Sequence, residues 1–542
     1  MNIFEKYKPI IVTSIKKYQN DLNISNLSEL NGVTVESPPV EFDYDISCNV
    51  CLILAKKNKL NPKLLAEKLQ AVLLKDIVDF SAINIAGPGF LNIKLSKKCI
   101  QNIIKDIFAS NKNYGSNKDT KKYNLEFVSA NPTGPMHVGH CRGAIYGDVL
   151  GNLLKFNGNK VIKEYYINDY GNQIVNFCKS VFLRIREIKY NEAFQDSPNL
   201  YPGIYIKDFA KKIIEKNPKN LFENFKKSYD LISTQALDSS MDLIKDDLKR
   251  LGIVHDYFFS ESELIKKDLV TKSIDQLKKD KLVIEGYLNP PKGEENKDWK
   301  KSKRLIFKST LFGDDSDRAL QKDDGSWTYF ANDIAYHSDK VSRNYDVLIN
   351  VLGADHTGYI KRISAAVKAL SKGKTELQCR VCQLVKLYKD NQPFKMSKRA
   401  GDFISAKDLL NEVSKDSIRF MMLNRSNDVE LDFDFNKVLE KSKENPVYYV
   451  QYCYARINSL FRSLQLKIDA PVELDLDNFN LNDYENKILR KILDWPKVID
   501  IASKKYEPHR LPFYLYDLAT LFHSYWSKGN IDESYRFLSN GK

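Results

Sequence analysis

EFVSANPTGPMHVGHCRGAIYG, at residues 126–147, contains three kinds of local structure in succession. Apolar and polar residues alternate at 125–128 and predict a strand, while the prolines and glycine at 131–135 exclude regular structure. Apolar residues at helical spacing in 144–154 then predict a helix. A helix that begins after such a turn presents unpaired N–H groups and a positive dipole end, which together favour phosphate binding.

Two histidines, His137 and His140, stand at the predicted start of this helix. The pair alone is equally compatible with an ordinary surface or core position, so it assigns no function. The chain contains no GxxxxGK[ST] sequence, which excludes a P-loop, and no acidic residue lies nearby at metal-ligand spacing.

A second motif, Lys395-Met396-Ser397-Lys398, follows far downstream in a polar segment. An HxGH turn followed by a KMSK loop resembles the class I aminoacyl-tRNA synthetases. Longer stretches resemble the bacterial type of arginyl-tRNA synthetase, over nearly the whole chain. These are EFVSANPTGPMHVGH, NDYGNQ (168–173), DGSWTYFANDIAYH (324–337), VLGADHTGY (351–359) and KMSKRAGDF (395–403).

Length and composition favour a globular protein of several domains. The chain has 542 residues, of which 43% are hydrophobic and 28% charged, and its net charge of +14 favours an anionic partner such as nucleic acid. Neither a signal peptide nor an apolar run long enough for a membrane helix is evident. We therefore expect a cytoplasmic protein without membrane contact, and a monomer, because no apolar stripe lacks an intramolecular use.

The eight cysteines include two CxxC pairs, Cys48/Cys51 and Cys379/Cys382. Such pairs either bind zinc or are buried as free thiols. The first pair lies in a predicted helix, and the second lies in a predicted strand, where the two side chains point to opposite faces. We expect buried thiols and no protein-bound zinc or other metal.

Three domains are expected in an α/β multidomain protein. Residues 1–112 predict an N-terminal α+β domain, followed by a polar linker. Residues 118–435 alternate strands and helices and predict a Rossmann-type parallel sheet, with a helical insertion at about 176–275. Residues 436–542 predict an all-α domain with helices at 437–464, 483–502 and 511–527.

The resemblance implies roles for the outer domains. The N-terminal domain would bind the tRNA elbow and the C-terminal domain the anticodon. The family continues beyond the end of this sequence with one more long helix, so the completeness of the anticodon domain stays open.

The resemblance also implies a reaction, in which the arginine carboxylate attacks the α-phosphate of ATP with Mg2+, and arginine then passes to tRNA(Arg). Such a site needs donors and cations around the phosphates rather than a nucleophile. His137, Gly139, His140, His356, Lys395, Ser397 and Lys398 are the expected ATP-binding residues, with His137, His140, Lys395 and Lys398 catalytic. Lys398 is the residue that we expect at the transition state.

A guanidinium requires a carboxylate that accepts two parallel hydrogen bonds. Tyr329 and Asp333 are four residues apart in a predicted helix, so they share a face and form a candidate cradle. Asp333 could also serve only to complement the helix dipole. The resemblance also places three residues at the backbone end of arginine: Glu126, Asn131 and His137. Asp355 or His356 would complete the site. Asp169 and Gln173 also match the family, with less defined roles.

Three alternatives remain: a class I synthetase for cysteine or methionine, a small-molecule nucleotidyltransferase with an HxGH turn, and a non-catalytic tRNA-binding paralogue. Missing zinc ligands and the Tyr329/Asp333 pair disfavour the first, and length and charge disfavour the second. The paralogue should have lost His140, Lys395 or Lys398, all of which are present. No editing domain is apparent, as expected where guanidinium recognition suffices for selectivity.

Overall fold

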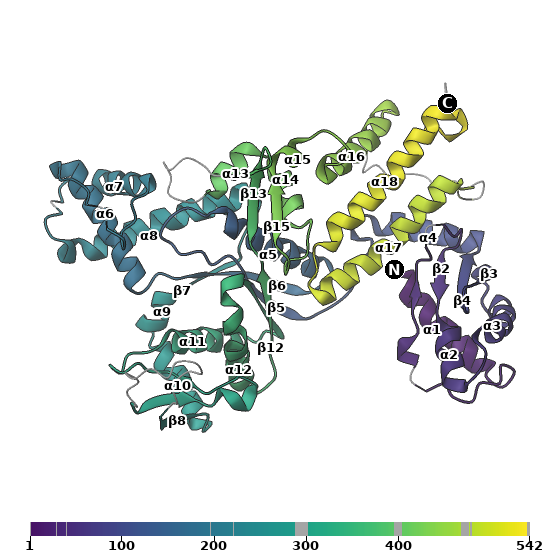
Figure 1. The fold of residues 1–542 in the computed structure, drawn as a ribbon, viewed down its shortest axis with the longest axis horizontal. Coiled ribbons are helices and arrows are strands. Elements are labelled where there is room, and N and C mark those ends of the chain that lie inside the picture. The colour runs from purple at the N-terminus through teal and green to yellow at the C-terminus, as the bar shows by residue number, and fades with distance from the viewer. Residues whose placement is uncertain are drawn as a thin grey trace. The chain divides into compact units, whose positions relative to one another are not determined.

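The computed structural model describes residues 2–28, 30–39, 41–195, 197–220, 222–287, 302–394, 404–467, 476 and 480–538 (Figure 1). The chain packs as two compact units. One comprises Lys118–Val447 with Glu507–His509, and the other comprises Met1–Asn117, Tyr448–Tyr506 and Arg510–Lys542. Each unit is described by itself.

A five-stranded parallel sheet forms the centre of the first unit. Its strands are β5 (Lys122–Glu126), β6 (Lys160–Ile167), β7 (Tyr257–Ser260), β11 (Val347–Gly353) and β12 (Glu376–Cys382), in the order β12-β11-β5-β6-β7. The chain leaves β5 towards β6 on one side and later returns to β11 on the other. This reversal of strand order places a crevice at the carboxyl ends of β5 and β11, where α/β proteins bind their ligands.

Helix α5 (Val138–Phe156) connects β5 to β6, and three helices connect β6 to β7. These helices, α6 (Asn172–Tyr190), α7 (Ile204–Lys216) and α8 (Phe225–Arg250), pack around a core that includes Phe177 and Phe209. Figure 1 shows α6 and α7 grouped beyond the sheet, with α8 leading back towards it.

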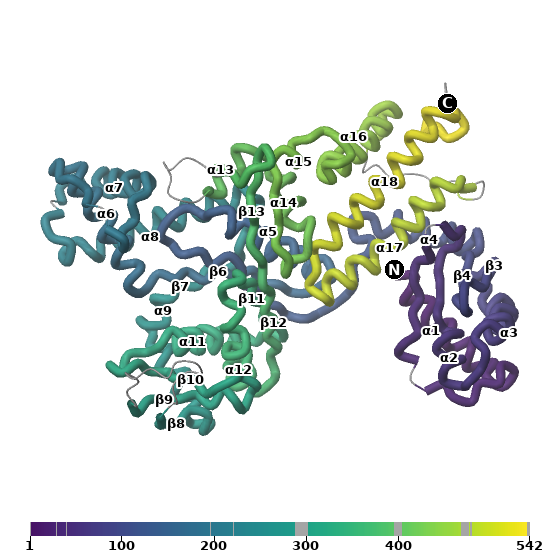
Figure 2. The backbone as a smooth tube through the Cα atoms, in the orientation of Figure 1, coloured from purple at the N-terminus to yellow at the C-terminus, as the bar shows by residue number. Residues whose placement is uncertain are grey.

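Two smaller antiparallel or mixed sheets complete this unit (Figure 2). One contains β8 (Val283–Gly286), β9 (Arg304–Phe307) and β10 (Arg318–Ala319), beside α9 (Glu261–Lys266), α10 (Leu269–Lys279), α11 (Tyr329–Ser342) and α12 (Ile360–Ser371). The other contains β13 (Val385–Lys389), β14 (Gln392–Pro393) and β15 (Leu431–Asp434). Helices α13 (Ala406–Glu412) and α14 (Lys415–Met422) lie between β14 and β15 in the chain, and α15 (Phe435–Leu439) follows β15. Thr328 caps α11, because its side chain accepts a hydrogen bond from the Ala331 amide.

The second unit joins the N-terminal part of the chain to the C-terminal helices. The N-terminal part has a sheet of order β1-β2-β4-β3 and four helices. Its elements are α1 (Ile3–Lys17), β1 (Val35–Glu36), β2 (Ile46–Cys48), α2 (Val50–Asn58), α3 (Pro62–Asp76), β3 (Phe80–Ala86), β4 (Phe90–Leu95) and α4 (Lys97–Ser110).

The C-terminal helices are α16 (Pro446–Ser463), α17 (Asp483–Lys505) and α18 (Arg510–Ile531). Helix α17 contacts the N-terminal part through Arg490, which donates to Asp43 at 2.7 Å and to Asp45 at 2.8 Å. The Trp495 indole also donates to the Tyr114 carbonyl at 3.0 Å. These contacts explain why the two ends of the chain pack as one unit.

The predicted fold class is confirmed, but several local predictions were wrong. The strand predicted at 125–128 ends at Glu126, and Val128 and Ser129 have left-handed backbone conformations instead. The region predicted as a helical insertion at 176–275 includes β7, which belongs to the central sheet. Strand β15 was missed, and the helix predicted at 437–464 is divided between α15 and α16.

Cysteine positions also differ in part from expectation. Cys48 lies in β2 rather than in the predicted helix, and Cys379 is only partly buried, whereas Cys51 and Cys382 are buried. Across the described residues, no group of three or more His, Cys, Asp or Glu side chains is placed to hold a metal ion. None of the described helices has the length and apolar character needed to cross a membrane.

Close packing at Gly147 fixes α5 against the chain that leaves β5. A Cβ atom at Gly147 would lie 2.2 Å from Cγ of Phe127, a buried ring next to Glu126. At Gly143, one turn earlier, the nearest atom to an added Cβ would be Val351 Cγ1 at 3.9 Å. Helix α5 therefore lies in close contact with the segment after β5 at Gly147, but not at Gly143.

This difference predicts opposite effects for two matched substitutions. Gly147→Ala should lower the unfolding free energy by about 1–3 kcal/mol through overpacking. Gly143→Ala should leave it unchanged or raise it by up to about 1 kcal/mol, since alanine is the better helix former. Calorimetric melting of both variants would measure this, and equal melting temperatures would contradict the proposed contact.

Candidate active site

The turn between β5 and α5 places both histidines at a helix N-terminus. His137 is the N-cap residue, and its Nδ1 accepts a hydrogen bond from the Gly139 amide at 3.1 Å. His140 Nδ1 accepts from the His137 amide at 3.3 Å, which completes a reciprocal capping box. Because each Nδ1 is an acceptor, each ring carries its proton on Nε2.

The two imidazole rings are stacked and neutral. Their centroids are 3.7 Å apart with an interplanar angle of 29°. Burial lowers the pKa of His137, and burial together with His137 lowers the pKa of His140 to about 3. At neutral pH both rings are therefore uncharged N–H donors rather than cations.

Gly139 has a packing reason to lack a side chain. A Cβ atom there would lie 2.9 Å from Cε1 of the His137 ring. The expected close approach of adenine at Gly139 stays a prediction, and the glycine is already explained by the ring that it accommodates.

A backbone bridge connects this turn to the segment after the KMSK motif. The Val138 amide donates to the Ile404 carbonyl at 2.9 Å, and the Ala406 amide donates to the Met136 carbonyl at 2.8 Å. The predicted residues Lys395, Ser397 and Lys398 lie outside the described residues. The chain six residues beyond Lys398 nevertheless reaches the histidine turn.

The backbone after β5 is strained and held in place. Val128 and Ser129 have φ values of 72° and 45°, which are unusual for non-glycine residues and especially for a β-branched one. The Tyr165 hydroxyl donates to the Ala130 carbonyl at 2.7 Å, and the Tyr166 amide donates to Ser129 Oγ at 3.1 Å. These bonds to β6 fix the position of the chain just beyond Glu126.

Three carboxylates gather at the carboxyl ends of the strands. Asp333 on α11 accepts a hydrogen bond from the Tyr359 hydroxyl. Burial, together with the charges of Glu126 and Glu261, raises the pKa of Asp333 to about 7, although Tyr359 and Lys340 oppose the rise. This cluster of carboxylates therefore holds negative charge that is poorly solvated and suited to a cation.

Glu261 was not predicted as a site residue. It is 6% exposed at the start of α9, accepts from Asn332 Nδ2 at 3.2 Å, and has its pKa raised by burial and then by Asp169. Asp169 holds this segment, because its carboxylate accepts from Ser260 Oγ at 2.6 Å and from the Ser262 amide at 2.8 Å. The available signal was an acid directly after a parallel strand, but that strand, β7, was itself missed.

Other predicted residues lie at the surface or edge of the site. Tyr329 is 79% exposed, and the phenol bonded to Asp333 is that of Tyr359, although Tyr329 and Asp333 do lie one turn apart on α11. The side chains of Asp355 and His356 in η4 (Ala354–Tyr359) are exposed and 3.4 Å apart. Their arginine and ATP roles stay predictions.

Asn131, in the turn after β5, and Gln173, in the first turn of α6, are both exposed. Asn131 Oδ1 accepts from Asn168 Nδ2 at 3.2 Å, which joins the turn after β5 to the turn after β6. Their substrate roles are likewise predictions.

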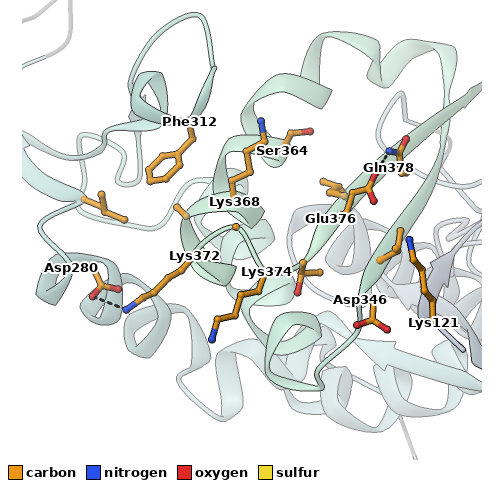
Figure 3. Close-up of a pocket in the computed structure, with 16 residues that line it drawn as sticks. Lys121, Asp280, Phe312, Asp346, Ser364, Lys368, Lys372, Lys374, Glu376 and Gln378 are labelled. Carbon is orange, nitrogen blue, oxygen red and sulfur yellow. Dashed lines mark hydrogen bonds and ion pairs between the residues drawn. The ribbon is translucent and has the colours of Figure 1, made fainter. Parts of the chain in front are cut away.

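A separate cavity of about 1060 Å³ lies at the opposite edge of the sheet (Figure 3). It is lined by Lys121 and Asp346, which precede β5 and β11, and by Lys368, Lys372 and Glu376. Because these positions are at the amino ends of the strands, this cavity is distinct from the histidine turn and the carboxylates.

The fold and the placement of these groups are those of a class I aminoacyl-tRNA synthetase. The family description "tRNA synthetases class I (R), catalytic domain" matches residues 103–461, "DALR anticodon binding domain" matches 450–536, and "Arginyl tRNA synthetase N terminal domain" matches 6–95. The chain belongs to the arginyl-tRNA synthetase family.

Relatives support this assignment over the full length. An arginine–tRNA ligase of Pelagibacter ubique is 53% identical over 545 residues, covering 100% of this chain and 94% of that protein. One of Bartonella bacilliformis is 44% identical, with 99% and 94% covered.

Solved structures agree. A putative arginyl-tRNA synthetase from Campylobacter jejuni has a TM-score of 0.71 at 34% identity, covering 80% of this chain and 92% of that one. Thermus thermophilus arginyl-tRNA synthetase, at 18% identity, TM-score 0.67 and coverages of 99% and 92%, shares the fold.

The carboxylate cluster predicts how Asp333 titrates. Tyr359→Phe removes a hydrogen bond to the charged form, so the pKa of Asp333 should rise above about 7. Glu261→Gln removes a like charge, so the same pKa should fall. Carbon-13 NMR of protein labelled at the aspartate carboxyl carbons would measure both shifts, with Asp333→Asn identifying the resonance. Shifts of the same sign in both variants would contradict the cluster.

Proposed function

We propose that this chain is an arginine–tRNA ligase, which activates L-arginine with ATP and transfers it to tRNA(Arg). In the first step a carboxylate oxygen of arginine forms a bond to the α-phosphorus of ATP, and pyrophosphate leaves with the bonding electrons. In the second step the terminal ribose hydroxyl of tRNA attacks the aminoacyl carbonyl, and AMP leaves. The full-length relatives, all named for arginine at 42–53% identity, carry this proposal.

The histidine turn is proposed to hold the ATP phosphates. His137 and His140 present Nε2–H donors at the positive end of the α5 dipole, and such donors stabilise charge that develops on phosphate oxygens. Lys395 and Lys398, with Ser397, are proposed from the sequence motif to contact the β- and γ-phosphates. Mg2+ is proposed to accompany ATP, bound by the phosphates rather than by a protein cage.

The carboxylate pocket is proposed to hold arginine. Asp333, with Tyr359 and Glu261 beside it, accepts the guanidinium, while Glu126 and Asn131 face the backbone end of the substrate. A neutral or shorter amino acid would leave these buried acids unpaired, so the pocket selects without an editing step.

The outer parts of the chain are proposed to bind tRNA. Helices α16–α18 form the helical domain proposed to contact the anticodon, and the α+β region at 1–112 is proposed to contact the tRNA elbow. The net charge of +14 suits a polyanion. We propose a monomer that acts in the cytoplasm, where protein synthesis consumes its product.

The test is ATP–pyrophosphate exchange with each of the twenty amino acids, with and without tRNA. We expect exchange with arginine alone, and only when tRNA is present. Exchange driven by another amino acid would overturn the specificity. Folded protein that exchanges with none, even with tRNA(Arg), would overturn the enzymatic function.

Arginine binding should depend on pH. Because free Asp333 has a pKa of about 7 and the bound guanidinium favours its carboxylate, binding releases a proton below that pH. The dissociation constant should therefore rise by up to about tenfold per unit as the pH falls below 7. Calorimetric titration between about pH 5.5 and 8.5 measures this.

Asp333→Asn provides the control for this experiment. This variant should bind arginine more weakly at pH 8. Its dissociation constant should no longer rise in the same way as the pH falls below 7. If the dissociation constant of the wild-type protein did not change with pH, the guanidinium would have to bind to a group other than Asp333.

A further inference from the structure

We propose that Lys340 is a positioning residue, which turns Glu126 so that one carboxylate oxygen faces the α-ammonium group of the substrate. The inference rests on the proposed function, since it concerns how the arginine pocket is set. Lys340 would act on the substrate only through Glu126, without touching it.

Lys340 is a fully buried cation. Its side chain is 0% exposed on α11, its Nζ donates to Glu126 Oε2 and, at 3.2 Å, to Asn350 Oδ1, and it lies 4.4 Å from the centroid of the Tyr336 ring. An ammonium without water needs a carboxylate partner, because an unpaired buried charge costs several kcal/mol. Glu126 supplies that partner by direct contact.

This contact leaves the two oxygens of Glu126 unequal. Oε2 is engaged by Lys340, whereas the partner of Oε1 is Ser129 Oγ at a long 3.4 Å. The Glu126 side chain is 15% exposed, and its charge acts on Asp333. Oε1 is therefore the oxygen available to accept a hydrogen bond from a substrate ammonium.

A short chain of hydrogen bonds fixes Lys340 itself. Asn350 lies opposite Glu126 in the β11–β5 pairing, so Lys340 bridges two neighbouring strands. Asn350 Nδ2 is 2.9 Å from His337 Nε2, and His337 Nδ1 is 2.8 Å from the Asp333 carbonyl. A carbonyl accepts only, so His337 carries its proton on Nδ1 and accepts at Nε2 from the Asn350 amide.

The charge of the site suits arginine. Glu126, Glu261 and Asp333 make the site acidic, Asp169 adds negative charge beside Glu261, and Lys340 offsets part of it at Glu126. Such a site favours a substrate with two cationic groups, guanidinium and ammonium. Without Lys340, Glu126 would lose its fixed direction.

The test compares three ligands by calorimetry on the full chain: L-arginine, agmatine, which lacks the carboxylate, and 5-guanidinopentanoate, which lacks the ammonium. In Lys340→Met we expect arginine and agmatine to bind at least about tenfold more weakly, as for loss of a charged hydrogen bond. Binding of 5-guanidinopentanoate should change less than about twofold. A merely structural role would weaken all three equally, and that result would overturn the proposal, as would unchanged arginine binding.

Two further variants secure the comparison. Lys372→Met removes a lysine that also has a carboxylate partner, Asp280 at 3.6 Å, but is 68% exposed, and it should leave all three affinities unchanged. Asn350→Asp gives Lys340 a competing carboxylate at constant volume. This variant should bind arginine and agmatine more weakly, by a smaller factor than Lys340→Met, and 5-guanidinopentanoate nearly as before. It serves as the test of the proposal if Lys340→Met does not fold.

Failure of the proposed function has a different signature. Wild-type protein that binds neither arginine nor agmatine, and shows no exchange with tRNA, would refute arginine as substrate. Wild-type protein that binds arginine and loses all three ligands together on Lys340→Met would refute only the positioning role.

Discussion

The central constraint on this structure is an imbalance of charge in a poorly solvated cluster of carboxylates. Glu126, Glu261 and Asp333 approach each other at the carboxyl ends of the strands, with Lys340 as the buried cation among them. Carboxylates in such surroundings favour either protonation or a positive partner, which is why the pKa of Asp333 rises to about 7. The cluster is thus least stable when no cation lies beside it, and the guanidinium of the proposed substrate would supply that cation.

The surrounding framework keeps these acids from moving apart. Glu126 is the last residue of β5, Asp333 is set by the capped start of α11, and Glu261 is held by the hydrogen bonds of Asp169. The left-handed backbone at Val128 and Ser129 ends the strand abruptly, and the chain reaches the first histidine, His137, eleven residues after Glu126. Strain of this kind persists only where neighbours fix it, here Tyr165 and Tyr166.

Much of this could be predicted from sequence, because the signals were local. Strand β6 and helix α5 follow from hydrophobic patterning, and the histidine turn follows from prolines, glycine and motif spacing. Strand β7 was missed since its four residues, Tyr257–Ser260, show no alternation and become a strand only by pairing with β6. Glu261 was missed with it.

Partners brought together by tertiary packing had no local signal. Tyr359 approaches Asp333 from 26 residues away, whereas the sequence suggested Tyr329, one turn before it. Lys340 did leave a trace, as a lysine on the helix face that also carries the buried residues Tyr336 and His337. A buried lysine on an apolar face requires an acid, but which acid it meets depends on the strand order.

The neutrality of the two stacked histidines also bears on how the reaction ends. A site that held phosphate with fixed positive charge at the turn would retain pyrophosphate as tightly as it held ATP. In the proposed reaction His137 and His140 donate hydrogen bonds to phosphate without forming ion pairs, and burial lowers the pKa of each ring and so keeps it neutral. The turn would then release pyrophosphate without separating opposite charges of its own, which leaves that separation to the proposed lysines, Lys395 and Lys398.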